Sequence, residues 1–211
     1  MAKSAKAFSR PEIDRNTPPR ERLLRAGASV FADKGYEGGT VREICELART
    51  SPNMIHHYFG SKQLLYYEVL SLFSERILEV PIRIISQPPQ SRENLIARLE
   101  IFIGETLEAL TADPDLYRTI VRERVIVDAI EVYNAELVKF LELGKKAGIV
   151  RPGLDSEMLT GMILDRLGNQ ILYATWIDEI SGANILNDVS YRDRWLRANI
   201  DILLHGILTP D

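Results

Sequence analysis

Apolar residues recur at helical spacing along most of the chain. Between Arg20 and Lys34 they fall every third or fourth position, at Leu23, Leu24, Ala26, Ala28, Val30 and Phe31. Gly35 follows the basic Lys34, which is typical of a helix end. The pattern predicts a first helix from about residue 18 or 19 to Lys34.

A shorter helix is predicted to begin after Thr40. This residue is a good N-cap, and Glu43 three positions later completes a capping box. The inward face of the predicted helix consists of Val41, Ile44, Cys45 and Ala48. Cys45 is therefore expected to be a small buried residue rather than a nucleophile.

The next predicted helix carries few inward residues. Ser51 is expected to cap it, with Pro52 in the first turn, and only Ile55 and Phe59 face inward. Two helices of about eight residues separated by about three, the second held by two large residues, match a helix-turn-helix. The second helix of such a unit enters a major groove about 12 Å wide.

The rest of the chain is predicted to be helical segments separated by proline and glycine. Ser61 caps a helix that runs to Val80 and stops at Pro81. Further helices are predicted over residues 92–112, 114–127, 128–147, 156–181 and 190–208. No alternating strand pattern and no internal repeat is present, so the predicted fold is all-α with about nine helices.

Composition is that of an ordinary globular protein. The 211 residues are 45% hydrophobic and 27% charged, which allows one small module and a larger domain with its own core. No stretch approaches the roughly 18 to 20 apolar residues of a membrane span, and the first residues show no apolar signal region. The single cysteine cannot form an internal disulfide, so we expect a cytoplasmic protein.

Charge is divided unevenly along the chain. Residues 1–62 hold eleven Lys/Arg against seven Asp/Glu, a net charge of +4, and the remaining 149 residues have a net charge of −8. A basic end on an acidic body is expected when only that end meets phosphate. Residues 1–19 are poor in apolar residues and are predicted to be a mobile arm, which either follows DNA through Lys3, Lys6, Arg10 and Arg15 or is a solvated tail.

Catalytic and metal-binding patterns are not recognisable. His56 and His57 point about 100° apart on a helix, and the third histidine is the distant His205. No phosphate-binding glycine loop, nucleophile elbow or zinc-protease motif is present. We therefore expect no enzyme activity, no cofactor and no metal.

Three stretches, in order and without gaps, resemble a known family. RERLLRAGASVFADKGY, TVREICELA and HHYFGSKQLL resemble the N-terminal region of the tetracycline-repressor (TetR) family of transcription factors over residues 20–65. The resemblance implies a helix-turn-helix DNA-binding domain over 20–65 and a helical ligand-binding and dimerisation domain over 66–211. It further implies a dimer, most commonly a repressor, that binds a palindromic operator in double-stranded DNA and responds to a small-molecule effector.

The family pattern assigns DNA contacts to individual residues. Carried over, it implies that Thr40, Tyr58 and Lys62 contact phosphates, whereas Arg42 and the residues 52–54 face bases. The full expected set is Thr40, Arg42, Ser51, Pro52, Asn53, Met54, His56, His57, Tyr58 and Lys62. The alternatives are a surface lysine at 62, a rim residue at 58 that covers the core, and a solvated side chain at 53.

Four positions depart from the family pattern: Gly27, Arg49, Thr50 and His56. Arg49 stands in the turn where glycine is usual, so it either strains the turn or adds a phosphate contact. His56 replaces a tyrosine whose hydroxyl commonly reaches a phosphate.

Candidate effector contacts are less specific. The expected set is Phe102, Thr106, Tyr117, Met158, Met162, Asp165, Asn169 and Tyr173, and the last five form one stripe along a predicted helix. Such a stripe is more often part of a core or of a dimer seam than of a ligand site. Asp165 and Asn169 would need a partner if buried.

The last predicted helix has an apolar face of Leu196, Ile200, Leu203, Leu204 and Ile207. The resemblance implies that the last two helices pack against a second copy, which makes the protein a homodimer. Two other classes stay open: a metabolite carrier without a DNA function, and a helical enzyme that depends on Asp165. The sequence favours neither, because its specific signals lie in the first 65 residues.

Overall fold

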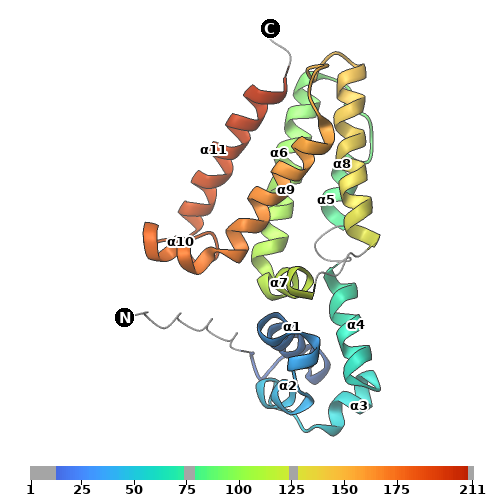
Figure 1. Ribbon diagram of the computed structural model, residues 1–211, viewed down its shortest axis with the longest axis vertical. Helices are drawn as coiled ribbons and strands as arrows, with labels where there is room; N and C mark the ends of the chain where they lie inside the picture. The colour runs from blue at the N-terminus through green and yellow to red at the C-terminus, as the bar shows by residue number, and fades with distance from the viewer. Residues whose placement is uncertain (1–12, 74–78, 124–127, 209–211) are drawn as a thin grey trace. The chain divides into compact units, whose positions relative to one another are not determined.

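The computed structural model describes residues 13–73, 79–123 and 128–208 (Figure 1). Within these ranges the chain is helical without strands, and an isolated bridge joins Val150 to Leu208. The eleven helices are α1 (Pro19–Gly38), α2 (Val41–Ala48), α3 (Asn53–Phe59), α4 (Lys62–Phe73), α5 (Glu79–Ile85), α6 (Arg92–Ala112), α7 (Pro114–Glu123), α8 (Asp128–Lys146), α9 (Ser156–Leu172), α10 (Ala174–Ser181) and α11 (Val189–Ile207). The all-α prediction is confirmed.

The helix expected to run to Val80 is described as α4 up to Phe73 and as α5 from Glu79, and the residues between them, 74–78, lie outside the described residues. Pro81 was expected to stop this helix, but it lies within α5, which continues to Ile85. The predicted ending at residue 127 lies outside the described residues.

One predicted helix is divided at Tyr173. We predicted one helix over 156–181, but Tyr173 has φ −104° and ψ 14°, which ends α9 and starts α10. The apolar spacing continues through the break, so periodicity alone did not reveal it.

The chain separates into two compact units, and the division falls within α7. The N-terminal unit consists of residues 1–71 and 118–125, and its fully buried side chains include Leu23, Phe31, Ile44, Ile55 and Leu65. In the same unit, the hydroxyl of Thr119 donates a hydrogen bond of 3.1 Å to the carbonyl of Ala28.

The arm predicted over residues 1–19 is only partly described. Ile13 is buried and residues 14–17 form a turn closed by the N–H of Thr17, which donates to the carbonyl of Asp14. Ile13 therefore packs, whereas residues 14–16 are exposed, so the mobile arm stays a prediction. The expected contacts of Lys3, Lys6 and Arg10 lie outside the described residues.

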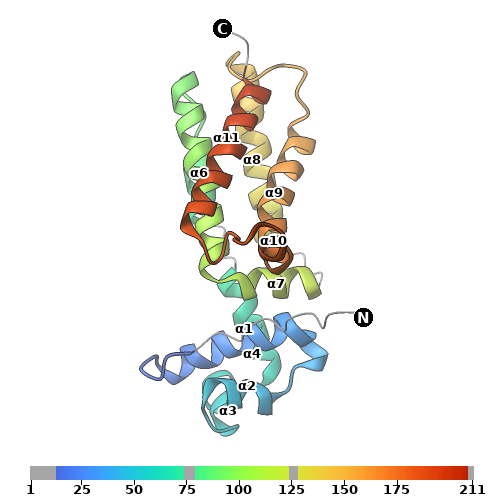
Figure 2. The same cartoon turned by 90° about the vertical axis from the view of Figure 1, so that its left-hand side faces the viewer.

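The C-terminal unit consists of residues 72–117 and 126–211. Its long helices α6, α8, α9 and α11 lie alongside one another, and the short α10 lies at one end of them (Figures 1 and 2). The core includes Leu95, Leu99, Phe102, Tyr133, Leu137 and Phe140. None of the helices in the described ranges has the length and apolar character needed to cross a membrane.

Candidate DNA-binding site

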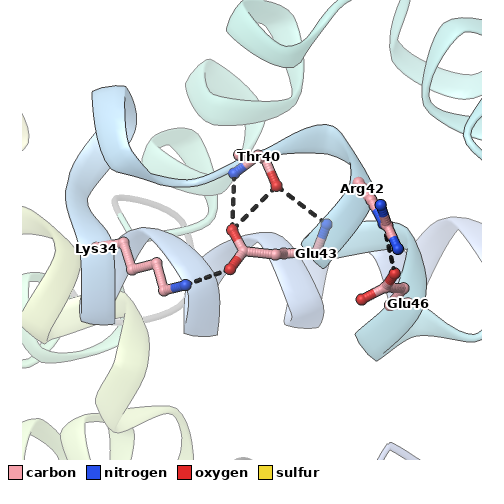
Figure 3. A network of polar contacts seen from close by, with 5 residues as sticks. All are labelled: Lys34, Thr40, Arg42, Glu43 and Glu46. Atoms are coloured by element: carbon pink, nitrogen blue, oxygen red, sulfur yellow. Dashed lines mark hydrogen bonds and ion pairs between the residues drawn. The ribbon is translucent and has the colours of Figure 1, made fainter.

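The start of α2 is held by a capping box. The N–H of Glu43 donates to Oγ1 of Thr40 at 3.2 Å, and the N–H of Thr40 donates to Oε2 of Glu43 at 3.2 Å. Lys34 of α1 also pairs with the Glu43 carboxylate (Figure 3). The hydrogen bonds from Lys34 and then Thr40 lower the pKa of Glu43 to about 2. The predicted box is confirmed, and it also ties α2 to α1.

The turn after α2 is made by Arg49 in the left-handed conformation, with φ 53° and ψ 49°. Its N–H donates to the carbonyl of Glu46, and the N–H of Thr50 donates to that of Cys45 at 2.9 Å. A side chain in this conformation costs about 1 to 2 kcal/mol relative to the right-handed one. Arg49 therefore strains the turn; its contact with a phosphate stays a prediction.

Helix α3 is anchored by two side chains. Ile55 and Phe59 are 0% and 5% exposed, as predicted. The helix starts later than expected, at Asn53, and the first turn is closed by the Ser51 carbonyl, which accepts the Met54 N–H at 3.0 Å. No side chain caps this end, because Pro52 occupies the N-cap position. On the remaining faces of α3, Asn53, His56 and His57 are exposed, whereas Met54 and Tyr58 are half-buried.

His56 makes one intramolecular hydrogen bond. Its Nδ1 lies 2.9 Å from the carbonyl oxygen of Gly60, so this nitrogen carries the proton and donates. In the neutral ring the remaining Nε2 is then an acceptor only.

Lys62 begins α4 next to an aromatic cluster. Oγ of Ser61 accepts the N–H of Leu64 at 3.1 Å, which confirms the predicted cap. The Lys62 ammonium lies 4.4 Å from the centroid of the Tyr36 ring, and this ring lies 4.9 Å from that of Tyr66. Tyr36 was not predicted as a site residue, since it is 26 positions from Lys62 in the sequence.

Arg42 points outward from the first turn of α2 and meets Glu46 one turn later. Its Nε donates to Oε1 of Glu46 at 2.8 Å, and this hydrogen bond raises the pKa of the guanidinium (Figure 3). The two side chains are 84% and 62% exposed. Sequence reasoning missed Glu46, although its spacing of four from an arginine was a usable signal.

The ten residues expected to contact DNA all lie between the N-cap of α2 and the first residue of α4. None of them is fully buried: Met54, Tyr58 and Lys62 are half-buried and the others are exposed. Among the described residues, no group of three or more His, Cys, Asp or Glu side chains is placed to hold a metal ion.

The eight expected effector residues are not gathered in one cavity. Phe102 and Thr106 are buried, and both contact Tyr133: its ring lies 5.1 Å from that of Phe102, and its hydroxyl is hydrogen-bonded to Thr106. Burial raises the pKa of Tyr133. Tyr117 is half-buried, and burial and then the charge of Asp165 raise its pKa.

The other five, Met158, Met162, Asp165, Asn169 and Tyr173, are exposed on α9 or at its end. Asp165 and Asn169 are thus not buried polar groups. A cavity of about 300 Å³ lies between α9 and α11, and of the eight expected residues Met162 lines it. It is lined mostly by apolar residues, together with Arg151, Arg166 and Asn199.

Several large apolar side chains of the C-terminal unit are exposed to solvent. On α9, α10 and α11, and at Tyr173 between α9 and α10, they are Met158, Met162, Tyr173, Trp176, Ile180, Val189 and Ile202. On the predicted face of α11, Ile207 is buried, whereas Leu196, Ile200, Leu203 and Leu204 are half-buried.

Comparison with known proteins places these observations in a family context. The family model described as "Bacterial regulatory proteins, tetR family" matches residues 23–69. The transcriptional repressor NicS of Pseudomonas putida is 27% identical over 149 residues, which span 69% of this chain and 66% of that protein. The transcriptional repressor KstR2 of Mycolicibacterium smegmatis is 28% identical over 153 residues, which span 69% of this chain and 74% of that protein.

Solved structures show the same fold. The ketosteroid transcriptional regulator KstR2 of Mycobacterium tuberculosis superposes with a TM-score of 0.69 at 21% identity, covering 95% of this chain and all of that one. The TetR-family regulator PfmR of Thermus thermophilus gives a TM-score of 0.68 at 19% identity, and the match covers 92% of this chain and all of that one.

Proposed function

This chain belongs to the tetR family of bacterial regulatory proteins, and we propose that it represses transcription as a homodimer bound to a palindromic operator. The relatives named above are transcriptional regulators and not enzymes. The observation that carries the proposal is the geometry of α3: it is held by Ile55 and Phe59 alone, and Asn53, His56 and His57 on its other faces are exposed. A helix so exposed is free to enter a major groove.

Within this proposal, the ten site residues divide by chemistry. Lys62, Thr40 and Tyr58 contact phosphates, and the exposed His56 completes this set. Arg42 reads a guanine edge, Asn53 an adenine edge, and Met54 packs on a thymine methyl group. Ser51, Pro52 and His57 complete the surface that meets the groove.

The proposed dimer forms through the exposed face of α9, α10 and α11. Met162 and Ile202 are exposed and also line the cavity between α9 and α11, so this cavity opens onto the same face. A second copy packed there would remove these side chains from water. The symmetry would place two α3 helices about 34 to 36 Å apart, in successive major grooves.

We assign effector binding to the C-terminal unit. Phe102 and Thr106 contact the buried Tyr133, so a ligand that enters there must displace Tyr133 and replace its hydrogen bond to Thr106. Tyr117 of α7 lies against Gly168 of α9, whereas the exposed residues of α9 are assigned to the dimer. An effector that binds one dimer conformation more tightly shifts the population and thereby releases DNA.

DNA binding is tested by selecting sequences from a random duplex pool and measuring the affinity of the selected duplex and of a scrambled duplex. We expect a palindromic preference, which Arg42→Ala weakens at one base position and Lys62→Ala leaves intact while lowering both affinities. A carrier without a DNA function would show no preference and would tolerate both substitutions. An enzyme would require turnover that depends on Asp165.

Dimerisation is tested by sedimentation equilibrium with matched substitutions. Ile202→Arg places a charge on the proposed interface, whereas Val132→Arg places the same charge at an exposed position of α8. We expect Ile202→Arg to yield monomers and Val132→Arg to remain dimeric. Dimers of equal affinity in both variants would contradict this interface.

A further inference from the structure

We propose that Glu46 is a specificity-determining residue of the DNA site, acting as a positioning residue for Arg42. It holds the guanidinium by Nε, which leaves the two terminal nitrogens for a guanine, and its charge prevents Arg42 from serving as a general phosphate contact. This inference rests on the proposed function, and it names a residue that lies outside the ten expected contacts.

The contact itself is well defined. Nε of Arg42 lies 2.8 Å from Oε1 of Glu46, one helical turn away on the outer face of α2 (Figure 3). Both side chains are largely exposed, so the core of the N-terminal unit does not require the pair. The pair is therefore available to contact DNA.

The geometry of the guanidinium determines which of the N–H groups of Arg42 remain free to contact a base. Arginine has five N–H donors in a planar fork, one on Nε and two on each terminal nitrogen. A guanine presents two acceptors, O6 and N7, which take two roughly parallel N–H groups. Because Glu46 occupies Nε, Arg42 keeps its terminal pair for such a contact, and the carboxylate limits rotation of the side chain.

The second Glu of this region does not compete for Arg42. Glu43 accepts hydrogen bonds from Thr40 and pairs with Lys34, so it belongs to the capping network on the other side of the helix start (Figure 3). Figure 3 shows two separate sets, Lys34–Glu43–Thr40 and Arg42–Glu46. Glu46 is therefore the carboxylate that acts on Arg42.

Charge then separates the roles of the two cations at the site. Arg42 and Glu46 together are neutral, so the pair adds little to the attraction for phosphates of arbitrary sequence. Lys62 lies over the Tyr36 ring and, among the described residues, forms no ion pair with a carboxylate. Lys62 thus contributes affinity for a duplex of any sequence, and the Arg42–Glu46 pair contributes preference for one base sequence.

The experiment compares Glu46→Ala and Glu46→Gln with wild type on the selected duplex and on a scrambled duplex, over a series of salt concentrations. For Glu46→Ala we expect tighter binding to the scrambled duplex and an increase of about 1 in the slope of log K against log salt, as for one added phosphate contact. The ratio of the two affinities should fall at least about two- to threefold, the factor that an exposed pair of this spacing contributes. Glu46→Gln keeps an acceptor for Nε, so it should retain the base preference and still show the steeper slope.

Two controls separate this role from a structural one. Glu21→Ala breaks the similar exposed pair of Glu21 with Arg25 on α1, where the distance is 2.7 Å, and should change neither the slope nor the ratio. In the Arg42→Ala background, Glu46→Ala should leave the base preference unchanged, because the residue it positions is absent.

The outcomes are distinguishable. One outcome is that wild type prefers its selected duplex, but both Glu46 variants keep the wild-type ratio of the two affinities and the wild-type salt slope. The proposed role of Glu46 would then be wrong, and the proposed function would stand. If both affinities of the variants fall equally, together with the melting temperature, Glu46 is structural and the inference fails. If wild type shows no preference for any duplex, the proposed function fails and the inference fails with it.

Discussion

The Lys62 ammonium lies 4.4 Å from the centroid of the Tyr36 ring, so the first residue of α4 rests on an aromatic side chain near the end of α1. Gly35, with φ 74° and ψ 173°, kinks α1 immediately before Tyr36. The ring also packs against Phe31 and Tyr66. The proposed phosphate contact is thus positioned by the core of the N-terminal unit.

Replacing Tyr36 by leucine should weaken binding to any duplex. A cation above an exposed ring is stabilised by about 0.5 to 1 kcal/mol, so we expect a loss of about two- to fivefold in affinity for both selected and scrambled duplexes. Tyr36→Phe keeps the ring face and should bind like wild type. Equal weakening by both variants would instead assign the effect to the tyrosine hydroxyl.

Replacing Arg49 by glycine should stabilise the protein. Relief of the left-handed conformation predicts a gain of about 1 kcal/mol in the free energy of unfolding, measured by denaturant titration. Arg49→Ala keeps the Cβ atom and should show no such gain. If both variants lose DNA affinity equally, the guanidinium of Arg49 contacts a phosphate; if neither does, the residue only makes the turn.

Stability of the N-terminal unit should depend on Glu43 at acid pH. Its pKa is lowered from 4.5 to about 2 in the folded state, so its stabilising effect is complete above about pH 4.5 and is lost as the pH falls towards 2. The melting temperatures of wild type and Glu43→Gln should therefore differ most above pH 4.5 and converge near pH 2. Lys34→Met removes the largest cause of the shift and should reduce this pH dependence; a constant difference across the range would contradict the assignment.

Two glycines on α9 should respond oppositely to alanine. A Cβ atom on Gly168 would lie 2.0 Å from the hydroxyl oxygen of Tyr117, whereas one on Gly161 would meet nothing within 4 Å. We expect Gly168→Ala to destabilise the protein by about 1 to 3 kcal/mol through overpacking. Gly161→Ala should stabilise the helix by about 0.5 to 1 kcal/mol. Calorimetric melting measures both, and destabilisation of similar size in the two variants would contradict the close approach of Tyr117.

Local rules explain what was predicted well. The capping box of Thr40 and Glu43, the cap of Ser61 and the two anchors of α3 each depend on residues within four positions of one another. The resemblance to a family added the roles in DNA binding, which periodicity does not contain. Glu46 was also within reach, because it is four residues from Arg42 on one helix.

By itself, the sequence determined that the chain is helical and where most helices begin, and it predicted a helix-turn-helix over residues 20–65 that resembles a known family. Hydrogen bonds and caps within a helix are local, so these features follow from spacing. Only the tertiary structure decided that Lys62 rests on Tyr36, that Glu43 also binds Lys34, and that Asp165 and Asn169 face water. Such contacts depend on how distant segments pack, and a stripe of apolar residues looks the same in a core as on a face left open for a second copy.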